Sequence, residues 1–258
     1  MNAVLEGRHL HVALGGRTVL RDVSVSLARG GFTAIVGPNG SGKSTLLRAL
    51  CGLKSADGGE VRLNGAPIVE MSRRDIARRV SFLPQDTRCD FAFTVEEVVE
   101  MGRHPHRGRF SPAAARDREA VETAITLCDL HHLRGRTVDC LSGGERQRVA
   151  VARCLATEPD VILLDEPTAH LDLEHALNVL VLCRRLSETG RTVALATHDL
   201  AAVLRFATHA VLLHRGEVVG SGTPLSVLTP KACLATFAVQ AEVVRAASGQ
   251  STLIFDRP

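Results

Sequence analysis

The chain has 258 residues, of which 45% are hydrophobic and 23% charged, an ordinary balance for one large globular domain or two small lobes. Its 31 basic and 28 acidic residues leave a net charge of +3, too small to indicate a nucleic acid or an anionic membrane as partner. Eight Phe, with no Tyr or Trp, argue against an aromatic platform for single-stranded nucleic acid. We therefore expect no nucleic-acid partner.

The cysteines and the N-terminus indicate the compartment. Seven cysteines are scattered without a CxxC pair, which predicts reduced thiols packed in the core of a cytosolic protein. Residues 1–14 lack a basic stretch followed by an apolar core, so we expect no signal peptide. No apolar run approaches the ~20 residues needed to span a bilayer. The sequence thus predicts a soluble protein.

Short apolar runs indicate a parallel sheet. Rich in Val, Ile and Leu, they predict strands that are buried on both faces, at residues 32–36, 79–83, 161–165 and 192–196. Apolar residues are mixed with polar residues and glycine in two other stretches, 61–65 and 210–222, which predict antiparallel strands. The second of these stretches is expected to be a hairpin that turns at Arg215-Gly216.

The texture becomes helical between Gln85 and Pro159. Thr94 and Glu97 have the spacing of a capping box that opens a helix. Ser111-Pro112 predicts a cap and a first-turn proline before a second helix. Thr223-Pro224 predicts the same arrangement at the start of a tail that holds one helix and an indistinct end.

These patterns predict an α/β fold with an inserted helical lobe. Residues 1–85 and 159–222 are expected to form an α/β lobe that also carries the antiparallel strands. Residues 86–158 are expected to form the helical lobe, and residues 223–258 a C-terminal tail.

Residues 37–45, GPNGSGKST, match the phosphate-loop spacing G-x-x-x-x-G-K-[ST] between a predicted strand and a predicted helix. Glycines let backbone amides turn toward phosphate oxygens, and the helix directs its positive end to the same charge. We expect Lys43 to reach the β- and γ-phosphates and Ser44 to hold Mg²⁺. The expected nucleotide-binding residues of the loop are Gly37, Pro38, Asn39, Gly40, Ser41, Gly42, Lys43, Ser44 and Thr45. The loop predicts a P-loop NTPase (RecA-like) lobe that binds a nucleoside triphosphate.

Two adjacent carboxylates, Asp165 and Glu166, end the run VILLDEP. Because neighbouring strand residues point to opposite faces, we expect Asp165 to face Mg²⁺ near Ser44 and Glu166 to point toward the γ-phosphate. Glu166 is the predicted general base, or the group that polarises the attacking water. His198 follows another predicted strand at the sheet edge where ligands bind, so we expect it to hydrogen-bond the γ-phosphate.

Ser142-Gly143-Gly144-Glu145 has the form of a capping box at the start of a helix. Its exposed amides make a second anion site, yet the phosphate loop already surrounds its own nucleotide. The simplest resolution is that Ser142, Gly143 and Gly144 bind the γ-phosphate held by another copy. This hypothesis predicts a symmetric, head-to-tail homodimer with two ATP molecules at its interface.

The sequence LSGGE, after GPNGSGKST and before VILLDEP, resembles that of the ATP-binding cassette (ABC) ATPases over essentially residues 1–220. The resemblance implies that Gln85 touches Mg²⁺, takes part in catalysis and relays to a membrane partner. It implies that Asp172 lies in a loop that crosses the dimer, and that His198 is a switch histidine. The family usually has an aromatic residue that stacks on adenine, and Leu14 stands at that position here. Apolar contact from Leu14 or the guanidinium of Arg17 is expected to replace stacking.

The stretch after Gln85 resembles the cassettes of importers for iron–siderophore, haem and cobalamin, through the pattern TV-x-E-x-V-x-x-GR-x-P at residues 94–105. The resemblance implies an ATPase that powers import of an iron chelate, haem or a ferric siderophore, with cobalamin or another metal complex as an alternative. Its implied partners are a homodimer mate, two permease subunits and, indirectly, a substrate-binding protein, at the cytoplasmic face of the membrane. Phe91, Phe93 and Val95 either line a permease groove or pack inside the helical lobe. The motifs also leave open a regulatory cassette without transport and an exporter or lipid-type cassette.

Overall fold

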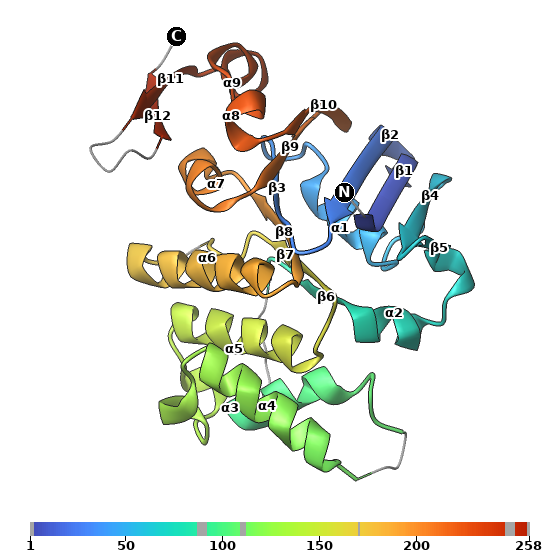
Figure 1. The fold of residues 1–258 in the computed structure, drawn as a ribbon, viewed down its shortest axis with the longest axis vertical. Helices are drawn as coiled ribbons and strands as arrows, with labels where there is room; N and C mark the ends of the chain where they lie inside the picture. Colours follow the sequence, from blue (N-terminus) through green and yellow to red (C-terminus); the bar gives the residue numbers. More distant parts are fainter. Residues whose placement is uncertain (1–2, 87–91, 109–111, 170, 246–250, 257–258) are drawn as a thin grey trace.

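The computed structural model describes residues 3–86, 92–108, 112–169, 171–245 and 251–256. Its central element is a six-stranded sheet with the strand order β10-β9-β3-β8-β7-β6 (Figure 1). The strands are β3 (Phe32–Val36), β6 (Val80–Leu83), β7 (Val161–Asp165), β8 (Thr192–Thr197), β9 (His209–His214) and β10 (Glu217–Gly222). All neighbours pair in parallel except β9 and β10, which are antiparallel. The four buried strands expected from the apolar runs are therefore confirmed.

The hairpin expected over residues 210–222 is present, and one of its strands also belongs to the parallel part of the sheet. β9 pairs in parallel with β3 on one side and antiparallel with β10 on the other. Arg215 (φ 50) and Gly216 (φ 83) both adopt the left-handed conformation, which favours the turn of a two-residue hairpin loop.

The register of the parallel strands brings three distant segments to one edge of the sheet. Val36 at the end of β3 lies opposite Thr197 in β8. Asp165 at the end of β7 lies opposite Ala196 in the same strand. The residues that follow each strand therefore begin loops within reach of one another, at the edge where ligands bind in such sheets.

A second sheet is antiparallel and has the order β2-β1-β4-β5. Its strands are β1 (Ala3–Leu14), β2 (Arg17–Ala28), β4 (Gly58–Leu63) and β5 (Ala66–Pro67), so the expected strand at 61–65 is confirmed as part of β4. Helix α1 (Lys43–Leu50) buries Leu46, Leu47 and Leu50 in a core shared by both sheets. This packing fixes the start of α1 against the six-stranded sheet.

Helix α2 (Arg73–Arg79) packs Ile76 into the same core as α1. The other helices before the C-terminal tail lie on the opposite face of the six-stranded sheet or at its edge (Figure 1). They are α3 (Val95–Glu100), α4 (Ala115–Leu127), α5 (Gly143–Ala156), α6 (Leu173–Glu188) and α7 (Leu200–Phe206). Short 3₁₀ turns occur at η1 (Ile68–Glu70), η2 (Met101–Arg103), η3 (His131–Leu133) and η4 (Val138–Cys140). α3, α4, α5 and α6 share one core with β7 and β8.

The start of α3 confirms the expected capping box. Glu97 N–H donates to Thr94 Oγ1 at 3.3 Å, and Thr94 N–H donates to Glu97 Oε2 at 2.7 Å. The helix expected after Ser111-Pro112 begins later than predicted, at Ala115; Ser111 lies outside the described residues. The reason is Asp117, whose carboxylate accepts the Ala114 N–H at 3.0 Å and so satisfies an amide at that point of the chain.

The guanidinium of Arg103, whose side chain is only 2% exposed, holds the helical segment together. It donates to Asp117 Oδ1 at 2.9 Å, to the Ala156 carbonyl at 2.6 Å and to Glu158 Oε2 at 3.0 Å. η2, α4 and the end of α5 therefore meet at one buried cation. Glu158 is itself left-handed (φ 52), and the chain enters β7 three residues later.

The tail contains more structure than the sequence predicted. Thr223-Pro224 opens a short helix, α8 (Pro224–Val227), as expected, and α9 (Pro230–Phe237) follows it. The prediction of an indistinct end is wrong: β11 (Gln240–Arg245) and β12 (Ser251–Asp256) pair as an antiparallel hairpin. β12 pairs with β11, the strand just before it, and the polar residues of β11 hide the alternation of polar and apolar positions that would predict a strand.

Six of the seven cysteines belong to the described residues, and Cys89 lies outside them. Cys51, Cys128, Cys154, Cys183 and Cys233 are buried as expected, whereas Cys140 is exposed, and these six are free thiols. Within the ranges given above, no helix combines the length and apolar character needed to cross a bilayer.

Candidate nucleotide-binding site

The phosphate loop joins β3 to α1 and has no room for side chains at its tightest points. A Cβ on Gly37 would lie 2.1 Å from the Leu213 carbonyl oxygen and 2.7 Å from Ser41 Oγ. Gly40 (φ 76) and Gly42 (φ 108) are left-handed, a conformation that glycine adopts without strain. The glycines let the backbone turn tightly in front of the α1 N-terminus, which is the geometry of an anion cradle.

Lys43, the first residue of α1, lies under this loop. Its Nζ donates to the Gly37 carbonyl at 2.8 Å and to the Pro38 carbonyl at 3.3 Å, and it lies 3.8 Å from Glu166 Oε1. Burial lowers the pKa of Lys43, and the nearby carboxylates of Glu166 and Asp165 partly oppose that shift. The ammonium is thus held at the loop by carbonyls and a carboxylate.

Ser44 and Asp165 meet as expected. Ser44 Oγ donates to Asp165 Oδ1 at 2.9 Å, while Asp165 Oδ2 is buried and has no hydrogen-bond partner. Burial raises the pKa of Asp165, and the Ser44 bond and the charge of Arg48 work against that rise. A buried carboxylate oxygen without a partner, beside a serine hydroxyl, is a donor set that suits Mg²⁺.

Glu166 reaches the loop for a reason other than strand alternation. β7 ends at Asp165, and Glu166 is left-handed (φ 49) with its N–H donated to the Ala196 carbonyl at 3.0 Å. Strand alternation therefore does not direct the two carboxylates, because Glu166 has left the strand. Asp165 nevertheless lies beside Ser44, as expected, and Glu166 lies beside Lys43. Its Oε2 lies 3.3 Å from Nδ1 of His198, and its side chain is 12% exposed.

Lys43, Ser44, Glu166 and His198 line one cavity of about 550 Å³, which we call the phosphate-loop hollow. Its lining residues are Pro38, Asn39, Gly40, Lys43, Ser44, Gln85, Glu166, His198 and Phe237. Gln85 joins it from an exposed bend after β6. Phe237, at the end of α9, is the lining residue that sequence reasoning missed, since no local pattern links it to a loop almost 200 residues earlier.

The serine and glycines of the second anion site lie elsewhere in the chain. Ser142 caps α5, with Glu145 N–H donating to its Oγ at 3.3 Å and its own N–H donating to Glu145 Oε2 at 2.7 Å, so the expected capping box is confirmed. Gly143 has open space where a Cβ would be, and a Cβ on Gly144 would meet the His175 ring at 3.0 Å. None of these three lines the phosphate-loop hollow of its own chain.

Asp172 and Leu14 also lie outside the hollow. Asp172 caps α6 by accepting the His175 N–H at 2.9 Å, and its carboxylate is 66% exposed. Leu14 is 46% exposed at the end of β1, opposite Arg17 across the hairpin. Of the proposed permease contacts, Val95 is fully buried and packs in the lobe core, Phe93 is 37% exposed, and Phe91 lies outside the described residues.

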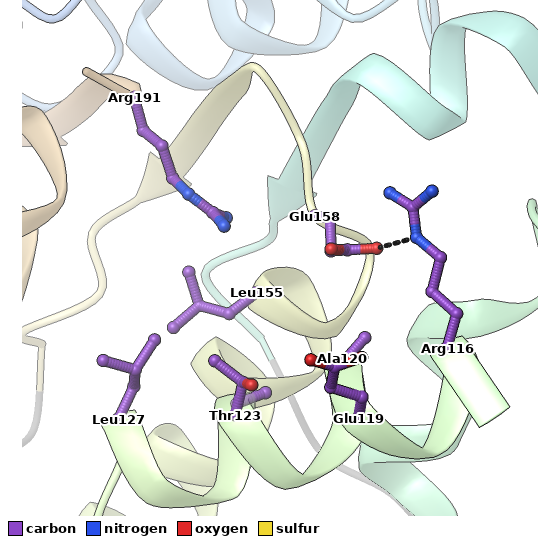
Figure 2. Close-up of a pocket in the computed structure, with 9 residues that line it drawn as sticks. Arg116, Glu119, Ala120, Thr123, Leu127, Leu155, Glu158 and Arg191 are labelled. Carbon is purple, nitrogen blue, oxygen red and sulfur yellow. Dashed lines mark ion pairs between the residues drawn. The ribbon is translucent and has the colours of Figure 1, made fainter. Parts of the chain in front are cut away.

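A separate cavity of about 420 Å³ lies between α4, the end of α5 and the start of β8 (Figure 2). It contains an ion pair of 3.4 Å between Arg116 and Glu158, and Arg191 points into it from the sheet side. Its walls carry acidic and basic groups together and no part of the phosphate loop. Across the described part of the chain, no three His, Cys, Asp or Glu side chains are grouped to hold a metal on their own.

Comparison with known proteins identifies the family. The model of the family described as ABC transporter matches residues 20–169. The iron(3+)-hydroxamate import ATP-binding protein FhuC of Bacillus subtilis (strain 168) is 38% identical over 241 residues, covering 93% of this chain and 90% of that protein. The hemin import ATP-binding protein HmuV of Pseudomonas fluorescens (strain Pf0-1) is 42% identical over 242 residues, covering 92% of this chain and 93% of that protein.

A solved structure agrees with these sequence matches. A chain of an ABC transporter assigned to the metal-chelate type, in an inward-facing conformation, superposes with a TM-score of 0.86 at 27% identity. The superposition covers 99% of this chain and 98% of that chain. The expected P-loop NTPase fold is thereby confirmed. The chain belongs to the ABC transporter family and is one of its ATP-binding, ATP-hydrolysing cassettes.

Proposed function

We propose that this ATPase powers the import of an iron chelate, haem or a ferric siderophore, through a membrane permease. The observation that carries the proposal is the likeness over nearly the whole chain to import ATP-binding proteins for hydroxamate-bound iron and for hemin. In this proposal two copies of the chain dock on two permease subunits at the cytoplasmic face, and a substrate-binding protein delivers the cargo. Residues 86–158 form the docking lobe, and residues 1–85 with 159–222 hold the nucleotide.

The phosphate-loop hollow binds ATP in this proposal. The loop from Gly37 to Thr45 supplies backbone amides to the phosphates, and Lys43 supplies a positive charge. Ser44, Asp165 and Gln85 hold Mg²⁺, which neutralises phosphate charge when bound. The unpartnered Asp165 Oδ2 supports this assignment, because a buried carboxylate oxygen without a hydrogen bond or a cation is costly.

Glu166 orients and deprotonates the attacking water. Its carboxylate lies between Lys43 at 3.8 Å and His198 at 3.3 Å, so two cation-capable groups fix its position. His198 holds Glu166 and hydrogen-bonds the γ-phosphate. Gln85 contacts Mg²⁺ and links the nucleotide site to the helical lobe, which begins at the next residue.

A second copy completes the site. Ser142, Gly143 and Gly144 present the N-terminus of α5 away from their own hollow, and Asp172 stands exposed at the start of α6. We assign them to the nucleotide held by the other copy in a head-to-tail dimer. Leu14 and Arg17 are assigned to the adenine base, through apolar contact and the guanidinium respectively, since both stand at the turn-side end of the β1–β2 hairpin.

Growth of the source organism tests the cargo. A strain that carries Glu166→Gln is compared with the parent on haem, on a ferric hydroxamate and on cobalamin, each as the sole source of its nutrient. The proposal expects failure on one iron source and recovery when the native chain is restored. Failure on cobalamin alone would assign the other metal complex, and normal growth on all three would refute metal-chelate import.

Co-purification addresses the alternative of another class. A tagged chain that brings down an integral-membrane protein, together with a substrate-binding protein encoded beside it, supports import. A chain that purifies only with soluble proteins would favour a regulatory cassette.

A further inference from the structure

One wall of the phosphate-loop hollow comes from the C-terminal tail. Phe237 ends α9 and lines the hollow together with His198, Asn39 and Gly40. The next residue, Ala238, is left-handed (φ 55) and turns the chain away into β11. An aromatic side chain is thus delivered to the nucleotide site by a segment that lies after the last strand of the central sheet.

The tail is packed against the two segments that frame the hollow. Its buried residues Leu228 and Cys233 share a core with Val36 and with Leu200. Val36 directly precedes the phosphate loop, and Leu200 opens α7 two residues after His198. Leu253 of β12 joins the same core, so the hairpin is part of this arrangement. The tail therefore packs against the strand that leads into the loop and against the helix that follows the histidine.

His198 lies just before the first of these helical residues, Leu200. Its side chain is 64% exposed and lies at the end of β8, with Glu166 Oε2 at 3.3 Å as its ion-pair partner. Glu166 in contrast is 12% exposed and is also held by Lys43. A histidine so exposed can leave its partner by a change of rotamer unless a neighbouring group occupies the space into which it would turn.

We propose that Phe237 is a positioning residue for ATP hydrolysis: its ring closes the hollow beside His198, keeps that histidine against Glu166 and excludes bulk water from the carboxylate. Exclusion of water strengthens the Lys43–Glu166–His198 interactions. The proposal rests on the phosphate-loop hollow being the ATP site. It gives the tail a task in the ATPase cycle beyond packing.

Phe237 lies at the margin of the tail core, so its role in positioning His198 can be tested apart from its role in the stability of the tail. Phe237 is only partly buried and packs at the margin of the core, whereas Leu228 and Cys233, both 0% exposed, fill its centre. Removal of the ring is therefore expected to leave the tail folded. Leu234 lies on the same helix, is 47% exposed and does not line the hollow, which makes it the matched control.

The test measures ATP hydrolysis and ATP affinity of the full chain for Phe237→Ala, Phe237→Leu and Leu234→Ala. Phe237→Ala is expected to lower kcat about tenfold, because misplacement of a catalytic group slows the chemical step. The Kd for ATP should stay within about twofold of the native value, since the loop amides and Lys43 are untouched. Phe237→Leu, which keeps apolar bulk, should recover most of kcat, and Leu234→Ala should behave as native.

Several results would overturn the proposal. These are a native kcat in Phe237→Ala, an equal loss in Leu234→Ala, or a weaker Kd with unchanged kcat. If Phe237→Ala lowers Tm by more than about 5 °C, Phe237→Gln decides, since a polar side chain of similar length should still lose kcat and a native kcat there refutes the wall. A Lys43→Ala protein that still binds ATP would instead refute the nucleotide site itself, and the proposal with it.

Discussion

Ser44 Oγ donates a 2.9 Å hydrogen bond to Asp165 Oδ1, although 121 residues separate the two in the chain. The bond joins the first turn of α1 to the end of β7, and it leaves the other carboxylate oxygen of Asp165 buried without a partner. The phosphate loop and the acidic strand end are therefore held in register before any nucleotide arrives. Because this bond needs only an acceptor oxygen on residue 165, a substitution that keeps the oxygen and removes the negative charge tests the role of the charge alone.

Asp165→Asn is expected to abolish most ATP hydrolysis while the fold is retained. The amide oxygen still accepts the Ser44 hydroxyl, but the negative charge offered to Mg²⁺ is lost, which we expect to lower kcat on the order of 10²-fold. Stability should not fall, because the carboxylate charge that the variant removes lies in a buried environment. Steady-state ATPase assays and thermal unfolding measure the two effects.

Asp160→Asn, an exposed change just before the same strand, is the control and should leave both quantities native. Native activity in Asp165→Asn would exclude Asp165 as a metal ligand.

Glu166→Gln is expected to bind ATP as the native chain does and to hydrolyse it roughly 10²-fold to 10⁴-fold more slowly, the range of a lost general base. The glutamine keeps the side-chain length but can take up no proton from water. Radiolabelled ATP retained after gel filtration, together with initial hydrolysis rates, makes the measurement. The control is Glu217→Gln on exposed β10. A hydrolysis rate near the native one would exclude Glu166 as the base.

Ser142→Arg is expected to block an ATP-dependent dimer, because a large cation would fill the space that the other copy's phosphate occupies. Light scattering on Glu166→Gln protein, with and without ATP and Mg²⁺, should show a shift from monomer to dimer. Adding Ser142→Arg should abolish the shift without loss of ATP binding.

Ser72→Arg replaces another exposed capping serine, at the start of α2, and should leave the dimer intact. If the protein stays monomeric with ATP bound in every variant, the isolated chain does not form the sandwich, and the same comparison moves to the complex with the permease.

Asp117→Asn is expected to destabilise the fold by about 3 kcal/mol at neutral pH, as the loss of a buried ion-pair partner does. Burial alone would raise the pKa of Asp117, but the Ala114 N–H and Arg103 outweigh it, and the pKa lies below the ordinary 3.8. The folded state binds this proton less tightly than the unfolded chain does. The stabilisation is therefore present above the ordinary pKa and is lost as the pH falls through the lower folded value.

Urea unfolding of the native and Asp117→Asn proteins at neutral and acidic pH checks this linkage. The difference in unfolding free energy should shrink as the pH falls below about 4. Glu188→Gln, in an exposed pair with Arg184, should cost no more than about 0.5 kcal/mol at either pH. A difference that grows in acid would contradict the sign of the Asp117 shift.

The parts of the site that local chemistry dictates were predictable from sequence. The phosphate loop, the capping boxes at Thr94 and Ser142 and the four buried strands each have a composition that few other structures allow. β1 and β2 escaped because register shifts interrupt their alternation of buried and exposed residues. The late start of α4 was not predicted because the capping group is the Asp117 carboxylate, which accepts the Ala114 N–H and is itself held by Arg103 from η2.

The path of Glu166 and the arrival of Phe237 could not be predicted either. Glu166 was expected to point to the γ-phosphate through strand alternation. It lines the hollow instead on a left-handed backbone just after the strand, and that backbone is a tertiary outcome. Phe237 stands in a helix with no distinguishing motif, and only the fold of the tail brings it to the hollow. Both are set by contacts between segments far apart in the chain.

The buried Arg103 couples the helical segment rigidly to the central sheet. It clamps η2, α4 and the exit of α5 to Glu158, from which the backbone runs in three residues to β7 and on to Asp165 and Glu166. A tilt of the helical segment therefore moves the start of β7 with it, because that strand begins only three residues after Glu158. A protein docked on the helices would therefore move β7 as well, and β7 ends at Asp165 and is followed by Glu166.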